Sequence, residues 1–356
     1  MDSQSNPSRR AILRTAGTLG AAGALGLADA AFRGSPADAS AATVTRIAGF
    51  AGANETPFAA MLTGSPRPTT PPTGVRVYLD AVTYPNVQGY ANTKWPDITG
   101  KYHSPAHALV SIRPKVETLL DGKFDAGLHA FMKHAPDGPA SLLTMWHECA
   151  TFTLSKPQYP KKPELYREGL RHLQRLAAGE IKGFGPTNVK VGVIDINPGY
   201  LHTYNHHASN PADIYKTWMA ANLDWYGCDL YDNKKLDLSV YGELSAFREL
   251  VNKLPGSKPN ADYQVNLPEC NSRIDPATGL STRKTDGPTG YRRSDFFHYA
   301  WAWLQNVGPG GHSSGLLGFW GGTGGEGAPW PPKNTPKGSL EALLKELGAE
   351  NAQSAP

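Results

Sequence analysis

The fold is decided by three neighbouring segments: ASLLTMW at Ala140–Trp146, PELYREGLRHLQRLAA at Pro163–Ala178 and VKVGVIDI at Val189–Ile196. The first and third are short and almost continuously apolar, which is typical of parallel strands covered on both faces. The second has apolar residues at helical spacing, with a proline in its first turn and Gly179 just past its end. Together the three segments predict a strand–helix–strand unit.

The same alternation continues in both directions from this unit. Further strands are predicted at Thr45–Phe50, Val75–Asp80, Ala108–Ile112, Leu223–Leu230, Tyr263–Leu267 and Leu316–Trp320. Further helices are predicted at Val116–His134, Pro211–Met219, Leu244–Leu254, Asp295–Val307 and Leu340–Leu347. Strands that alternate with helices over about 310 residues predict an α/β fold, a single-domain (β/α)8 TIM barrel. An open doubly wound sheet is the alternative, although its usual G-x-G-x-x-G turn is absent from the first loop.

Composition excludes several classes of protein. The 356 residues are 40% apolar and 10% aromatic, which is too much for a disordered chain. The net charge of +4 is mild, and no run of like charges suggests a nucleic-acid partner. Cys149, Cys228 and Cys270 allow at most one disulfide and match no zinc-binding spacing, so we expect buried thiols. A monomer is expected.

The first 41 residues have the layout of a secretory signal. Ser8–Arg14 (SRRAILR) carries an arginine pair, Thr15–Leu27 is weakly apolar, and small-residue cleavage sites follow as far as Ala41. The pair resembles a twin-arginine export signal, with a disordered basic tail as the alternative. We therefore expect residues 1–41 to be removed, a barrel over 43–348, a disordered tail over 349–356, and secretion without membrane attachment.

Two glutamates stand where predicted strands four and seven end. Glu148 closes TMWHE (144–148), and Glu269 lies in NLPEC (266–270). Active sites of TIM barrels lie at the carboxyl ends of the strands, where strands four and seven face each other. Strand alternation is expected to put Trp146 and Glu148 on one face. Glycoside hydrolysis needs such a pair: one carboxyl protonates the leaving oxygen, and the other attacks the anomeric carbon or activates water. Chance placement among 31 acidic residues is the alternative.

These residues resemble the retaining glycosidases of the large clan of (β/α)8 enzymes. The His147–Glu148 pair is similar to family 26 glycoside hydrolases, which include mannanases and usually continue with Met-Asn-Gly, where this chain has CAT. DGKFD at 121–125 is similar to the segment that opens that family's third helix. DWYGCDLY at 224–231 is similar to its sixth-strand motif, D-W-x-G-x-D-x-Y.

The resemblance implies a role for each matching residue. Glu148 would be the general acid/base and Glu269 the nucleophile. Tyr231 would hydrogen-bond Glu269, His147 would contact the sugar or orient an acid, and Trp320 would stack against the sugar. The implied substrate is a β-mannan or β-glucan, with no cofactor and no metal.

Three further residues complete the expected substrate-binding set: Arg113, Asp229 and Asn271. Arg113 ends the third strand, where binding of a sugar hydroxyl and a salt bridge within the barrel are both open. Trp225 is expected to fill the core between helices and sheet, with stacking on a sugar as the alternative.

Two other functions remain as alternatives. A non-catalytic carbohydrate-binding barrel would keep the aromatic residues without using the acid pair. A metal-dependent hydrolase would use His202, His206 and His207, although Pro198-Gly199 opposes a regular helix there. A serine hydrolase is disfavoured because the chain has no G-x-S-x-G motif.

Overall fold

The computed structural model of the chain describes residues 47–51, 74–79, 94–96, 107–136, 141–153, 156–196, 211–232, 240–258, 263–272, 280–283, 287–292 and 316–320. The leader, the His202/His206/His207 cluster and the predicted helices Asp295–Val307 and Leu340–Leu347 lie outside these residues. The predicted domain boundaries also fall outside them and stay predictions.

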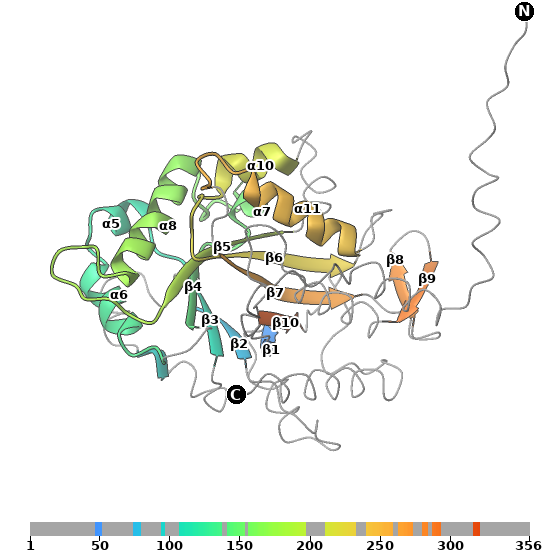
Figure 1. Cartoon of the computed structure of the whole chain (residues 1–356), viewed down its shortest axis with the longest axis horizontal. Coiled ribbons are helices and arrows are strands. Elements are labelled where there is room, and N and C mark those ends of the chain that lie inside the picture. Colours follow the sequence, from blue (N-terminus) through green and yellow to red (C-terminus); the bar gives the residue numbers. More distant parts are fainter. Residues whose placement is uncertain are drawn as a thin grey trace, which may run out of the picture. The chain divides into compact units, whose positions relative to one another are not determined.

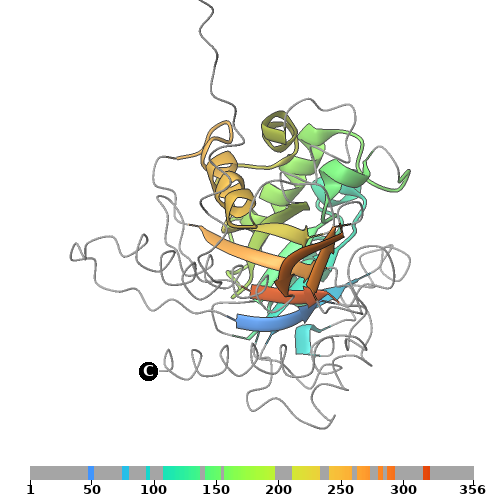
Figure 2. The same ribbon diagram turned by 90° about the vertical axis from the view of Figure 1, so that its right-hand side faces the viewer.

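Parallel strands form the centre of the described structure (Figure 1). They are β1 (Ile47–Ala51), β2 (Gly74–Tyr78), β3 (His107–Ile112), β4 (Ser141–Met145), β5 (Lys190–Ile196), β6 (Trp225–Asp232), β7 (Gln264–Ser272) and β10 (Leu316–Trp320). Strands β2 to β7 pair in chain order. Strand β10 pairs with β7 and with β1, and β1 pairs with β2, which closes the sheet. Figure 2 shows β10, in red, between β1, in blue, and β7, in orange. The parallel α/β fold is thus confirmed, and every predicted strand is present.

The described helices are α5 (Val116–Leu120), α6 (Asp125–Met132), α7 (Cys149–Phe152), α8 (Pro163–Ala177), α10 (Pro211–Trp218) and α11 (Val240–Asn252). Of these, α7 and α8 pack on β5, and α11 packs on β6. None of the described helices is long and apolar enough to cross a membrane. The complete (β/α)8 repeat stays a prediction, because the chain that follows β1, β2 and β10 lies largely outside the described residues.

The prediction of one helix over Val116–His134 is wrong. The chain forms α5 and α6 with a turn between them, where Gly122 has φ +74° and donates its N–H to Leu119 O at 3.0 Å. Glycine adopts this left-handed backbone without the steric cost that a Cβ brings. Beyond the turn, Asp125 opens α6 and lies 2.7 Å from Nε2 of His172 on α8. The apolar spacing continues across the turn, which hides it from a periodicity argument.

Several other boundaries differ from the predicted ones. β7 extends to Ser272, so Glu269 lies within the strand rather than after it. An antiparallel pair, β8 (Leu280–Arg283) and β9 (Gly287–Arg292), follows β7. The sequence pattern does not predict this pair, because neither LSTR nor GPTGYR has the apolar alternation of a half-buried strand.

The interior of the closed sheet changes character along the strands. Leu109, Leu142, Ile194 and Trp225 form a buried apolar cluster apart from the larger core that the helices cover. Trp225 is fully buried as expected, but it lies in this inner cluster and not in the core between helices and sheet where it was predicted. The buried polar residues farther along the strands are Ser111, Thr144, Asp229, Asn266 and Glu269. The carboxyl ends of the strands therefore present a polar interior.

Trp225 leaves no space for a side chain at the position that faces it on β5. Gly192 pairs with Trp225 in register, and a Cβ at Gly192 would lie 2.2 Å from Cδ2 of the indole. The indole is fully buried, and its Nε1 donates to Lys190 O at 3.0 Å. The tryptophan of one strand therefore requires the glycine of the next.

We predict that Gly192→Ala lowers the free energy of unfolding by about 1–3 kcal/mol or more, because overpacking forces strained side-chain and backbone positions. Urea denaturation would measure the change. Gly185→Ala is the matched control, since no atom lies within 4 Å of a Cβ there. Equal stability of the two variants would contradict the close approach of Gly192 and Trp225.

Candidate active site

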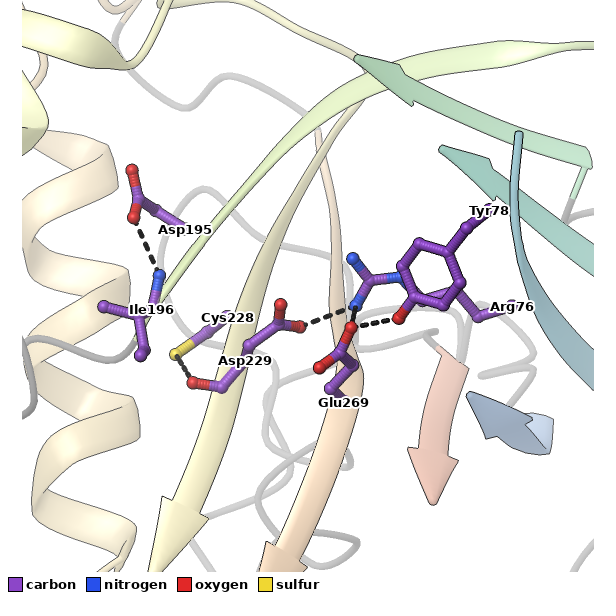
Figure 3. A network of polar contacts seen from close by, with 7 residues as sticks. All are labelled: Arg76, Tyr78, Asp195, Ile196, Cys228, Asp229 and Glu269. Atoms are coloured by element: carbon purple, nitrogen blue, oxygen red, sulfur yellow. Dashed lines mark hydrogen bonds and ion pairs between the residues drawn. The ribbon is translucent and has the colours of Figure 1, made fainter. Parts of the chain in front are cut away.

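A buried arginine joins two carboxylates at the carboxyl end of the sheet (Figure 3). Arg76 on β2 is fully buried, and its Nη1 lies 2.9 Å from Oδ1 of Asp229 on β6 and 2.8 Å from Oε1 of Glu269 on β7. Asp229 is also fully buried. A buried ion without a partner costs several kcal/mol, so the charges of all three side chains depend on this contact.

An extra residue in β7 shapes the position of the second glutamate. Asn266 pairs with Gly227 of β6 and Cys270 pairs with Leu230, so β7 has one more residue than β6 over this stretch. The register with β10 shifts across the same stretch. This is a β-bulge, which re-aims the side chains of the strand that carries it.

The bulge turns Glu269 toward the inside of the sheet. Leu267 belongs to the larger core between the sheet and the helices, which we call the outer core. In a regular strand Glu269, two residues later, would face the same way. Instead, Glu269 reaches Arg76 in the interior. Pro268, which has no N–H to donate to a neighbouring strand, lies in the bulge, where proline is tolerated.

Tyr78 on β2 holds the same glutamate. Its hydroxyl donates a hydrogen bond to Oε1 of Glu269 (Figure 3). The guanidinium of Arg76 lies 4.8 Å from the tyrosine ring centroid, and the His147 ring lies 5.0 Å from it. Burial raises the pKa of Tyr78 well above its ordinary value, although Arg76 opposes this, so the phenol remains a donor. Tyr231, predicted for this role, lies on β6, but its side chain is outside the described part of the structure.

Glu148 is presented by a strained turn rather than by a strand. β4 ends at Met145, and the backbones of Trp146 and Glu148 are left-handed, with φ values of 46° and 55°. Such values are uncommon for residues other than glycine and concentrate at functional sites. The prediction that Trp146 and Glu148 share a strand face is therefore wrong, because alternation ends before either residue. Trp146 packs in the outer core, and its Nε1 donates to Pro114 O at 2.7 Å.

The neighbouring strand β5 fixes this turn. The N–H of Glu148 donates to Ile194 O at 2.9 Å. Asp195 accepts hydrogen bonds from Ala150 N at 3.3 Å and from Thr151 Oγ1 at 3.4 Å, both in α7 directly after Glu148. Burial raises the pKa of Asp195 to about 7, against the lowering effect of these hydrogen bonds. Asp195 therefore positions the segment that carries Glu148.

The surroundings of Glu148 favour its protonated form. Burial raises the pKa of Glu148 well above its ordinary value, and the negative charges of Asp229 and Glu269 raise it further, while Arg76 lowers it. Burial also raises the pKa of Asp229, with Arg76 opposing. Three carboxyls thus share the field of one guanidinium, and Glu148 is suited to donate a proton near neutral pH.

His147 lies beside this group as a neutral imidazole. It is 7% exposed, and burial lowers its pKa well below the ordinary value, assisted by the positive charges of Arg76, Arg113 and Lys156. Its ring contact with Tyr78 links the β4 turn to β2. The predicted contact of His147 with a sugar stays a prediction.

The remaining predicted residues have different surroundings. Asp229, expected to contact substrate, is fully buried and bonds Arg76 instead. Arg113 is half-buried after β3, with its guanidinium 6.0 Å from the Trp146 ring centroid, and it forms no ion pair within the described residues. Asn271 lies on β7 and Trp320 on β10, and the side chains of both are outside the described part.

Sequence reasoning missed three residues of this site: Arg76, Tyr78 and Asp195. Arg76 and Tyr78 alternate with apolar neighbours in VRVYLD, so a charged residue at an inward-facing strand position was an available signal. Asp195 interrupts the apolar run VKVGVIDI in the same way. A buried charge within a strand usually has a specific partner, which only the register reveals.

The cysteines and the possible metal ligands also bear on the chemistry of the site. Cys149 and Cys228 are buried thiols outside any disulfide, as expected, while the side chain of Cys270 lies outside the described residues. Within the part of the chain that the structure describes, no group of three or more His, Cys, Asp or Glu side chains has the arrangement of a metal site.

Comparison with known proteins gives structural neighbours but no sequence relatives. No protein-family model and no curated protein matches the chain. It is similar to an endo-β-1,4-mannanase of glycoside hydrolase family 26 from Cellulomonas fimi, at 12% identity and a TM-score of 0.44, over 87% of this chain and 73% of the other. It is also similar to the family 26 domain of an endo-β-mannanase/endo-β-glucanase from Prevotella bryantii, at 13% identity and a TM-score of 0.41, over 86% and 89% of the two chains. A family 30 endoxylanase from Clostridium papyrosolvens matches at 11% identity and a TM-score of 0.41, over 86% and 72%.

We predict that Arg76→Leu destabilises the fold by about 3–5 kcal/mol, because it leaves two buried carboxyls without their cation. Thermal unfolding at neutral pH would measure the loss. The double variant Arg76→Leu/Asp229→Leu should recover part of it, since one unpaired carboxyl is then removed. Stability of Arg76→Leu equal to that of the unaltered protein would contradict the buried ion pair.

We predict a pH-dependent stability difference between the unaltered protein and Asp195→Asn. The folded-state pKa of Asp195, about 7, lies above the unfolded value, so the folded state binds the proton more tightly. The contribution of Asp195 to stability therefore falls as the pH rises from about 4 to about 7. Asp195→Asn lacks this dependence. Parallel stability curves for the two proteins in urea titrations across that range would contradict the assignment.

Proposed function

We propose that this chain is a secreted glycoside hydrolase with a (β/α)8 barrel, which cleaves a β-linked polysaccharide of mannan or glucan type with retention of anomeric configuration. One observation carries the proposal: the turn after β4 and the strand β7 bring two glutamates to the same end of a parallel sheet, where burial raises the pKa of Glu148 and Arg76 contacts Glu269. Two carboxyls in these contrasting environments are what double displacement requires. The paired-arginine leader supports export.

In the first step, Glu269 attacks the anomeric carbon while Glu148 donates its proton to the glycosidic oxygen. The C–O bond to the leaving group breaks, and a glycosyl ester with Glu269 forms. The left-handed backbone at Glu148 and its hydrogen bond to Ile194 O keep the donor in place. The retained hydrogen bond from Tyr78 directs the other lone pairs of Glu269 toward the sugar.

In the second step, Glu148 takes a proton from a water molecule while the water oxygen attacks the anomeric carbon. The bond between that carbon and Glu269 breaks, and the carboxylate is released. The negative charge of Glu269 is one of the causes that raise the pKa of Glu148. Once Glu269 is an uncharged ester, this contribution disappears and the pKa of Glu148 falls. The same side chain is therefore an acid in the first step and a base in the second.

Arg76 remains paired throughout this cycle. When the charge of Glu269 is lost in the ester, the guanidinium still contacts Asp229 at 2.9 Å. Asp229 thus acts on the reaction by holding Arg76 in place beside Glu269. Because Asp229 is fully buried, we assign it to positioning rather than to the sugar contact predicted from sequence.

The direct test uses Glu269→Ala and Glu148→Ala on aryl β-glycosides with good leaving groups and on β-mannan and β-glucan. Glu269→Ala should show no turnover, because no nucleophile remains. Glu148→Ala should lose about 10²–10⁴-fold on polysaccharide but far less on the aryl glycoside, whose leaving group needs no proton. Glu180→Ala, an exposed acidic position, is the control.

Azide distinguishes the two roles by product. Azide should rescue Glu269→Ala to an α-glycosyl azide, through one displacement, and Glu148→Ala to a β-glycosyl azide, through two. Full activity of Glu269→Ala on any glycan, or the same azide anomer from both variants, would overturn the proposed mechanism.

A further inference from the structure

Two cationic side chains flank one tyrosine ring beside the proposed acid/base. The guanidinium of Arg113 lies 5.8 Å from the ring centroid of Tyr159, and Nζ of Lys156 lies 5.6 Å from it. Arg113 follows β3 and Lys156 follows α7, so both belong to the carboxyl end of the sheet. Both cations are half-buried.

Aromatic faces hold these cations. Nζ of Lys156 lies 3.4 Å from the ring centroid of Phe152, and the guanidinium of Arg113 lies over the ring of Trp146. Cation–π contacts of this kind fix the direction of a positive charge. No ion pair to Arg113 occurs within the described residues.

The chain around Lys156 is one-sided in charge. Residues 149–163 (CATFTLSKPQYPKKP) contain three lysines and no acidic residue. Lys161 donates to Thr153 O and, at 2.9 Å, to Lys156 O, so one of these lysines ties the segment to itself. The segment that follows the proposed proton donor is therefore positive.

The field of this pair reaches the active site. Arg113 and Lys156 both lower the pKa of His147, the residue before Glu148. Tyr159, between the two cations, senses the charge of Glu148. The charges that act most on Glu148 itself are those of Asp229, Glu269, Arg76 and Asp195. Other residues therefore set the pKa of Glu148, and the two-step reaction assigns no part to Arg113 and Lys156.

Two buried polar atoms next to the pair also lack a hydrogen-bond partner in the described structure. They are the hydroxyl of Tyr159, whose side chain is 2% exposed, and Nδ1 of His147. Buried polar groups are normally hydrogen-bonded, and these two atoms can each bond a water molecule or a ligand. Two cations beside the Tyr159 ring, whose charges also act on His147, form an arrangement suited to an anion.

We propose that Arg113 and Lys156 form a subsite for a carboxylate of the substrate, so that the cleaved glycan carries a uronic acid next to the scissile bond. This inference rests on the proposed hydrolase function. Arg113 presents paired N–H groups that match a carboxylate, and Lys156 adds a second positive charge. The substrate class narrows from β-linked polysaccharides in general to acidic ones.

The test compares β-linked oligosaccharides with the same oligosaccharides oxidised at C6 to uronates. For the unaltered full chain, kcat/KM should be about 10-fold or more higher on the oxidised form, the gain expected from a charge-assisted hydrogen bond. Arg113→Gln and Lys156→Gln should remove this preference, mainly through a higher KM for the oxidised substrate. Lys115→Gln, an exposed position two residues from Arg113, is the matched charge control.

Equilibrium binding keeps the subsite testable apart from catalysis. Calorimetry should show tighter binding of the uronate form, lost in Arg113→Gln and partly kept in Arg113→Lys, with thermal melts to verify folding. Equal binding of uronate and neutral forms would overturn the subsite, even if Glu269→Ala abolished hydrolysis. Binding of a sulfated oligosaccharide as tight as that of the uronate would overturn the assignment to a carboxylate. If no glycan were hydrolysed while the uronate preference in binding held, the hydrolase proposal would fail and the anion site would stand.

Discussion

The contact of one buried guanidinium with two carboxylates is the interaction on which the rest of the site depends. Arg76 neutralises Asp229 and Glu269 where neither can be well hydrated. Glu148 adds a third acid to the same buried region, and Arg76 is the cation among the described residues that lowers its pKa. Because one cation cannot balance three negative charges, one of the three carboxyls is expected to stay protonated. Burial and the charges of Asp229 and Glu269 raise the pKa of Glu148 and favour its protonated form. The different chemical roles proposed for the two glutamates therefore follow from where a single arginine lies.

The backbone departs from regular geometry at each glutamate. Glu269 reaches the interior because β7 contains an extra residue between its pairings with Gly227 and Leu230. Glu148 comes under the charges of this group because the chain after β4 takes two left-handed residues and is then tied to β5. Both departures cost conformational free energy locally. The contact of Glu269 with Arg76 offsets this cost in β7, and the hydrogen bonds of Asp195 offset it after β4. Local rules that fail in this way are expected where function has set the geometry.

The sequence predicted the strands well and the site only in part. Apolar runs such as VKVGVIDI locate strands because burial on both faces leaves a direct compositional trace. The turn at Gly122, the bulge at Pro268 and the turn at Glu148 leave the surrounding apolar runs recognisable, so periodicity cannot reveal them. Arg76 lies between Val75 and Val77, and its partners are 153 and 193 residues away, given by 229 minus 76 and 269 minus 76. Only the register of the closed sheet brings them together.

The central claim is that the charge of Glu269 helps to keep Glu148 protonated. Carbon-13 NMR titration of the full chain, with labelled glutamate carboxyls and Glu148→Gln for assignment, measures this directly. The account predicts that Glu148 titrates well above the ordinary glutamate pKa and that its pKa falls in Glu269→Gln, where the neighbouring negative charge is absent. An ordinary pKa for Glu148 that is unchanged in Glu269→Gln would contradict the account.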